Sequence, residues 1–185
     1  MTQLTVSAMS AVARRRALVK WAMTSSTHSV DLAPNRQDAI TPLILEGMFK
    51  RFCLRVDRYV LQCKHVHFRN SHDRLRIIAF PEKLDINPHL HCFADLSEDY
   101  LGERRNLAWE QKLSDIWRSV AGESATIVID AQPDEGKAWY STKEAYRRDH
   151  YYLHSWDFHR EDKLRKRPSA VSLQRTATSR RAVTH

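Results

Sequence analysis

The feature that most constrains the fold is an apolar stripe along residues 39–63. The residues of the stripe are Leu45, Phe49, Phe52, Val56, Val60 and Cys63. They recur at spacings of three and four, the period at which side chains share one face of an α-helix. Such a helix is stable in water only when its apolar face packs against a second apolar layer. The remainder of the chain must therefore supply that layer.

Several short segments can supply the layer as strands of a β-sheet. The clearest is ATIVIDA, residues 125–131, which is short and rich in β-branched residues. The other segments predicted to be extended are 27–32, 65–70, 74–80, 89–96 and 151–159. A second amphipathic helix is predicted over residues 107–121, with Gly122 at its C-terminal end, and a third from near Lys137 toward Arg148.

The order of these elements favours one α+β domain. Two strand–helix–strand units around an antiparallel sheet give a ferredoxin-like sandwich with helices packed on the sheet. The chain has 185 residues, which suits a single domain with extensions. Residues 1–25 lack acidic side chains and are expected to form a weakly ordered basic arm. Residues 26–159 are the expected domain, and residues 160–185 a basic, disordered tail rich in serine and threonine.

Composition narrows the classes of function. The net charge of +8 and the pI of about 9.6 favour a polyanionic partner such as DNA, RNA or an anionic membrane. The four glycines form neither a dinucleotide-binding nor a P-loop pattern. Three cysteines without a Cys-x-x-Cys pair indicate a reducing compartment. No apolar run approaches the roughly 20 residues of a membrane span, so we expect a cytoplasmic protein without a membrane partner.

The segment NPHLHCF contains a candidate metal site. In a strand, His89 and His91 project from the same face, whereas Leu90 points to the other. Glu82 precedes His89 by seven residues, and a hairpin would bring its carboxylate close to the imidazoles. One carboxylate with two imidazoles suits Mn²⁺ or Mg²⁺. Asp85 is an alternative third ligand, and an ordinary strand pair beside a solvated loop carboxylate is the alternative to a metal site.

The segment WYSTKEAYRR contains a candidate nucleophile. Tyr140 and Lys143 share a face if this segment is helical. A tyrosine can attack a phosphodiester and stay covalently bound to the DNA, and a nearby lysine can stabilise the charge of the scissile phosphate. A half-buried aromatic residue beside a solvated lysine is the alternative interpretation. The neighbouring Tyr146, Tyr151 and Tyr152 are alternative nucleophiles.

Together these motifs resemble those of the HUH (histidine–hydrophobic–histidine) endonucleases, the family of the rolling-circle replication initiators. His89 and His91 match the His–hydrophobic–His motif of that family, and Tyr140 and Lys143 match its later Tyr-x-x-Lys motif. Some viral members also carry a glutamate at the position of Glu82. The stretch FPEKLDINPHLHCF is similar to the FPEHLDSN stretch of small bacterial and plasmid Rep-like proteins. The first family motif, an apolar strand with threonines, is only weakly matched by THSVDLAPNR.

The resemblance, which covers roughly residues 27–159, implies a metal-dependent endonuclease that acts on single-stranded DNA or a DNA hairpin. It implies that Glu82, His89 and His91 hold Mg²⁺ or Mn²⁺, and that Tyr140 forms a 5′-phosphotyrosine with help from Lys143. The chain contains no helicase domain, so unwinding would come from a host helicase. A bacterial, plasmid or phage origin fits such a role. The alternatives are a non-catalytic nucleic-acid-binding module, an inactive Rep relative and a structural protein with a charged surface.

Overall fold

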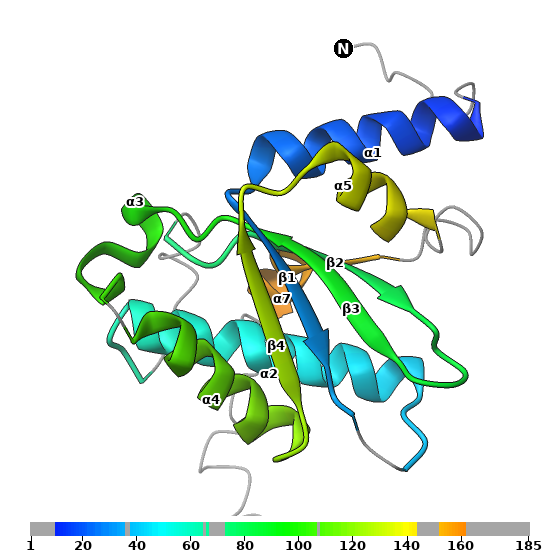
Figure 1. Cartoon of the computed structure of the whole chain (residues 1–185). Helices are drawn as coiled ribbons and strands as arrows, with labels where there is room; N and C mark the ends of the chain where they lie inside the picture. The colour runs from blue at the N-terminus through cyan, green and yellow to red at the C-terminus, as the bar shows by residue number, and fades with distance from the viewer. Residues whose placement is uncertain are drawn as a thin grey trace, which may run out of the picture.

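The computed structural model describes residues 10–35, 38–64, 66, 73–106, 108–143 and 152–161 of the chain. In chain order, the elements are α1 (Ala11–Ser25), β1 (His28–Ala33), α2 (Pro42–Val60), β2 (Ile77–Glu82), β3 (His89–Ala94), α3 (Glu98–Leu101), the 3₁₀ helix η3 (Gly102–Arg104), α4 (Trp109–Ala121), β4 (Thr126–Ala131), α5 (Glu135–Ser141), β5 (Leu153–His154) and α7 (Ser155–Glu161). Figure 1 shows helices on both faces of one sheet.

The sheet confirms the predicted α+β class. Its five strands are antiparallel to their neighbours and follow the order β4-β1-β3-β2-β5. The first four strands, with α2 and α4 as their connections, form the β-α-β-β-α-β arrangement of a ferredoxin-like fold. β5 adds a short strand beside β2, at the edge of the sheet.

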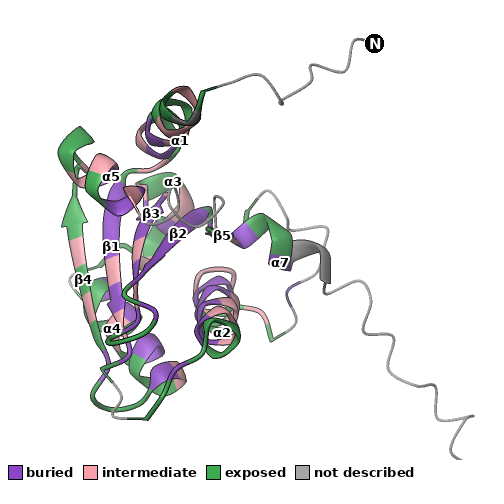
Figure 2. Ribbon diagram, turned by 90° about the vertical axis from the view of Figure 1, so that its right-hand side faces the viewer, coloured by how far each residue is buried: buried purple, intermediate pink, exposed green. Residues whose placement is uncertain are grey.

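Helices α2 and α4 cover one face of the sheet and build the main core (Figure 2). Thr41 caps α2 by accepting a hydrogen bond from the backbone N–H of Ile44 at 3.3 Å, and Pro42 follows at the first helical position. The predicted stripe is confirmed for Leu45, Phe49, Phe52 and Val56, which are buried on the side of α2 that faces Leu90 and Cys92 of β3. Val60 is only half-buried, and Cys63 lies beyond the end of α2. Trp117 of α4 is fully buried in the same core.

Helix α1 covers the opposite face together with α5. Its Val19 and Ala22 are buried against Ile78, Phe80 and Phe93 of the sheet. The expectation of a weakly ordered arm over residues 1–25 is therefore wrong for residues 11–25. The sequence does not predict this helix because, among its described side chains, only Val19 and Ala22 are buried, which gives no apolar stripe along the sequence.

Four strands end elsewhere than predicted, β1 one residue later, at Ala33, and β3 two residues earlier, at Ala94. β2 continues beyond Phe80 through Pro81 to Glu82, and proline is tolerated because β5 pairs with β2 only at Ile78 and Ala79. The strand predicted over residues 151–159 is only two residues long, and α7 follows it. The hydroxyl of Ser155 donates to Leu75 O at 2.7 Å and accepts from Ile77 N at 3.2 Å. This side chain thereby satisfies backbone groups of the β2 segment that a longer β5 would have paired.

Several predictions fall partly outside the described residues: the arm over residues 1–9, the extended segment 65–70 except Val66, the third helix beyond Lys143, residue 151 of the last strand, and the tail beyond Glu161. The short helices α3 and η3 were not predicted. All three cysteines are free thiols. Among the described residues, no helix is both long and apolar enough to span a membrane.

Candidate metal and tyrosine site

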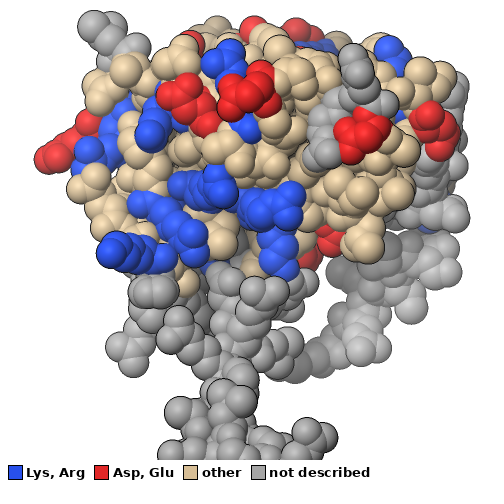
Figure 3. Space-filling model, turned by 90° about the horizontal axis from the view of Figure 1, so that it is seen from below, with Lys and Arg blue, Asp and Glu red and all other residues tan. Residues whose placement is uncertain are grey.

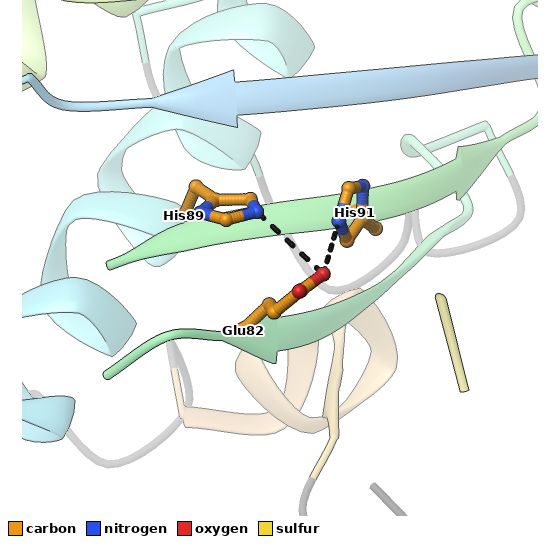
Figure 4. A group of neighbouring side chains, drawn as sticks. All are labelled: Glu82, His89 and His91. Carbon is orange, nitrogen blue, oxygen red and sulfur yellow. Dashed lines mark hydrogen bonds and ion pairs between the residues drawn. The ribbon is translucent and has the colours of Figure 1, made fainter. Parts of the chain in front are cut away.

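The β2–β3 hairpin brings the predicted metal ligands together (Figure 4). Glu82 pairs directly with His89 across the two strands, and His91 projects from the same face of β3. The Oε2 atom of Glu82 lies 2.6 Å from Nε2 of His91 and 3.7 Å from Nε2 of His89. The three ligand atoms all lie within 4.8 Å of one another, so this group could hold a metal ion. Asp85 is exposed in the following turn and is not part of the group.

The chemistry of the three donors fits a divalent cation. Glu82 is only 3% exposed, so it is not the solvated loop carboxylate of the alternative interpretation. Burial by itself raises the pKa of Glu82, but hydrogen bonds from Lys143 and His91 outweigh it and hold the pKa below its usual value. The carboxylate is therefore ionised at neutral pH. An anionic oxygen beside two imidazole nitrogens is a donor set for Mn²⁺, Zn²⁺ or a similar ion.

Helix α5 places Tyr140, the predicted nucleophile, next to Glu82 of this group. Asp134 caps the helix by accepting a hydrogen bond from Lys137 N at 2.7 Å. Tyr140, near the end of the helix, donates its hydroxyl to Glu82 Oε1 at 3.2 Å and is half exposed. Lys143 Nζ lies 2.7 Å from the same oxygen and 3.5 Å from the centroid of the Tyr140 ring. The tyrosine and lysine of the Tyr-x-x-Lys motif therefore both contact the carboxylate of the candidate metal group.

The side chain of Lys143 is positively charged where it contacts Glu82. Burial is the largest single influence and lowers the pKa of Lys143, but the interactions with Glu82 and Tyr140 together outweigh it and raise the pKa. The side chain is thus a cation at neutral pH, close to both the tyrosine and the carboxylate. The arrangement combines an accessible hydroxyl, a fixed positive charge and a group of metal ligands.

Beside the metal group lies a network of polar contacts that the sequence did not predict, formed by Asp31, Lys137 and Asp130. Asp31 of β1 accepts a hydrogen bond from Nδ1 of His91 at 2.7 Å. Lys137 of α5 lies 3.1 Å from Asp31 and 2.8 Å from Asp130 of β4. Since Asp31 engages Nδ1, it orients the ring so that Nε2 faces Glu82. Burial raises the pKa of Asp31, but the bonds from His91 and Lys137 outweigh it and lower the pKa.

The only sequence signal for this network was one charged residue inside a short strand. Asp31 interrupts the apolar pattern of residues 27–32, and its side chain lies on the same face as His91 because the two residues pair in register. Nothing in the sequence connected that position with Lys137, which lies more than a hundred residues away. The pairing of β1 with β3 brings Asp31 to His91, and the ion pair between Lys137 and Asp31 connects α5 to them.

The alternative nucleophiles are placed differently from Tyr140. The ring of Tyr152 packs against Phe80, with the ring centroids 6.3 Å apart. Tyr146 and Tyr151 lie outside the described residues. Among the tyrosines that the structure describes, Tyr140 is the one whose hydroxyl contacts a candidate metal ligand.

Comparisons of the chain with protein-family models, with curated proteins and with solved structures give no match.

Proposed function

We propose that this protein is a metal-dependent endonuclease of the HUH type that nicks and rejoins single-stranded DNA through a phosphotyrosine intermediate. The setting we propose is replication initiation or mobile-element processing in a bacterial cytoplasm, with unwinding supplied by a helicase of the host. One observation carries the proposal. The hydroxyl of Tyr140 and the ammonium of Lys143 meet the same carboxylate that joins the two histidines of the candidate metal group.

The chain's own residues account for the attack on DNA. The Tyr140 oxygen bonds to the scissile phosphorus as the bond from phosphorus to the 3′ oxygen breaks. Its proton leaves toward Glu82 Oε1, the present acceptor of that hydrogen bond, and solvent returns a proton to the departing 3′ oxygen. The products are a 5′-phosphotyrosine and a free 3′-hydroxyl. Attack of that hydroxyl on the adduct reverses the step and rejoins the strand.

The positive charge of Lys143 offsets charge that develops during the step. Its ammonium lies beside the Tyr140 ring, so it stabilises the phenolate character of the attacking oxygen and the added charge on the phosphate. Glu82, His89 and His91 would hold Mg²⁺ or Mn²⁺. When bound, such an ion polarises the phosphate and balances its charge. Asp31 and Lys137 keep His91 oriented toward this position.

The test needs no knowledge of the DNA target sequence. The protein is incubated with a pool of random single-stranded DNA and Mn²⁺, and a denaturing gel is examined for a protein–DNA adduct. The proposal predicts an adduct that Tyr140→Phe and His91→Ala abolish and that chelation of the metal prevents. Tyr152→Phe is the matched control and should retain the adduct. DNA binding without any adduct would instead support a non-catalytic binding module or an inactive relative.

A further inference from the structure

A band of basic side chains lies on the side of the molecule opposite the candidate site. Arg51, Arg55 and Arg58 of α2 are exposed, and their spacing of four and three residues places them along one face of the helix. Seen from below, on the side of α2 and α4, lysines and arginines gather in one continuous band, with most of the visible carboxylates on one side of it (Figure 3). Arg118 of α4 is exposed on the neighbouring helix.

The arginines of this band are available to bind anions. Among the residues that the structure describes, no carboxylate forms an ion pair with Arg51, Arg55 or Arg58. Arg55 uses one nitrogen to donate to the backbone oxygen of Ser119 at 3.1 Å, which fixes its position between α2 and α4. A guanidinium carries five N–H donors in a planar fork that matches phosphate oxygens. Arginines in a row on a rigid helix, without a carboxylate partner among the described residues, are thus suited to successive phosphates.

We infer that the basic face of α2, formed by Arg51, Arg55 and Arg58, binds the phosphate backbone of double-stranded DNA. The three residues span about 10 Å of a rigid helix. Neither α2 nor α4 exposes an aromatic side chain on which unpaired bases could stack, so contacts with phosphates are favoured over contacts with a single strand. The inference rests on the proposed function for the choice of DNA as the polyanion.

The location of the basic face of α2 indicates what binding of duplex DNA contributes to the proposed nicking reaction. α2 packs on the face of the sheet to which Leu90 points, whereas His89 and His91 point to the face covered by α5. The sheet therefore separates the duplex-binding face from the candidate nuclease site. A duplex beside the nicking position could be held on α2 while the unpaired strand enters the site on the other face.

A membrane surface fits this face less well than DNA does. The apolar side of α2 is buried in the main core, so the helix cannot insert that side into lipid. Leu43 and Ile44 are exposed in its first turn. Binding to anionic lipid vesicles is therefore measured beside binding to DNA.

The experiment measures the affinity of the protein for a short fluorescent DNA duplex of mixed sequence by fluorescence anisotropy. The titrations contain a metal chelator, which prevents cleavage, and are repeated over a range of salt concentrations. The full chain is used, so its terminal segments contribute equally to every variant. One variant replaces Arg51, Arg55 and Arg58 by glutamine. A matched control loses the same charge at exposed positions elsewhere, with glutamine at Arg16, Lys20 and Arg76. A third variant places lysine at the three α2 positions.

We expect the glutamine variant of α2 to bind the duplex roughly tenfold more weakly and its log–log salt slope to become shallower by ~2.7, since three phosphate contacts are lost. The control and the lysine variant should keep the slope of the wild type. Equal losses in the α2 variant and the control, or no loss in either, would overturn the inference. So would vesicle binding that depends on these arginines while duplex binding does not. The assay requires no cleavage, so its outcome is independent of whether Tyr140 forms an adduct.

Discussion

Replacing Asp31 by asparagine tests whether the carboxylate behind His91 supports the metal group. Asp31 Oδ1 lies 2.7 Å from Nδ1 of His91, and Lys137 holds the other oxygen at 3.1 Å. Asparagine keeps the size of the side chain and an acceptor oxygen but removes the negative charge. Loss of the carboxylate that accepts a hydrogen bond from a metal-binding histidine lowers the metal affinity by roughly 10–100-fold. Because the Asp31 side chain is 30% exposed, solvent screens its charge, and we expect about a tenfold loss, or about 1.4 kcal/mol.

The assay is calorimetric titration of the protein with Mn²⁺. Asp130→Asn is the matched control, because Asp130 shares the contact with Lys137 at 2.8 Å but does not touch His91. We expect its affinity to stay within about twofold of the wild type, and His91→Ala to lose binding. The reasoning is refuted if Asp31→Asn binds Mn²⁺ as tightly as the wild type, or if the Asp130 variant loses as much.

Three further predictions follow from single contacts. Lys143→Ala should slow adduct formation by about 10²-fold, whereas Lys143→Arg should keep much of the wild-type rate. A gel time course in which Lys143→Ala forms the adduct as fast as the wild type would contradict the role of the charge. Asp57→Ala should lower the free energy of unfolding by about 3–5 kcal/mol in urea denaturation, because it removes the buried carboxylate that accepts hydrogen bonds from Arg74 at 2.8 Å and from Leu75 N at 2.7 Å; a loss below about 1 kcal/mol would contradict this. Val19→Asp should release α1 from Phe93, and trypsin should then cut within α1 faster than in the wild type; unchanged digestion would show that this contact does not hold the helix.

The sequence predicted those parts of the fold whose pattern is long or regular. The stripe of α2 and the β-branched run of β4 identify their own elements, because a helix and a strand bury side chains with different periods. The β2–β3 hairpin followed from two apolar runs separated by a turn, and it explains why Glu82 and His89 could be paired without a structure. The antiparallel order of the four strands then followed from the order of the elements.

What the sequence could not predict depends on contacts between distant segments. Among the described side chains of α1 only Val19 and Ala22 are buried, and Leu18 and Met23 pack beside them half-buried, so its sequence pattern is that of a charged, solvated helix or arm. β5 ends early because Ser155 bonds to backbone groups far earlier in the chain. Asp31 acquires its role only when β1 pairs with β3. In each case a pairing in space, and not a local pattern, determines the result.

The most direct test of the proposed function is to locate the covalent bond. The adduct formed with single-stranded DNA and Mn²⁺ is digested with nuclease and protease, and its peptides are analysed by mass spectrometry. The proposed function predicts that the peptide containing Tyr140 gains a nucleotide joined through its 5′ phosphate and that the released strand ends in a 3′-hydroxyl. A nucleotide on any other residue, or DNA that is bound but never attached, would contradict it.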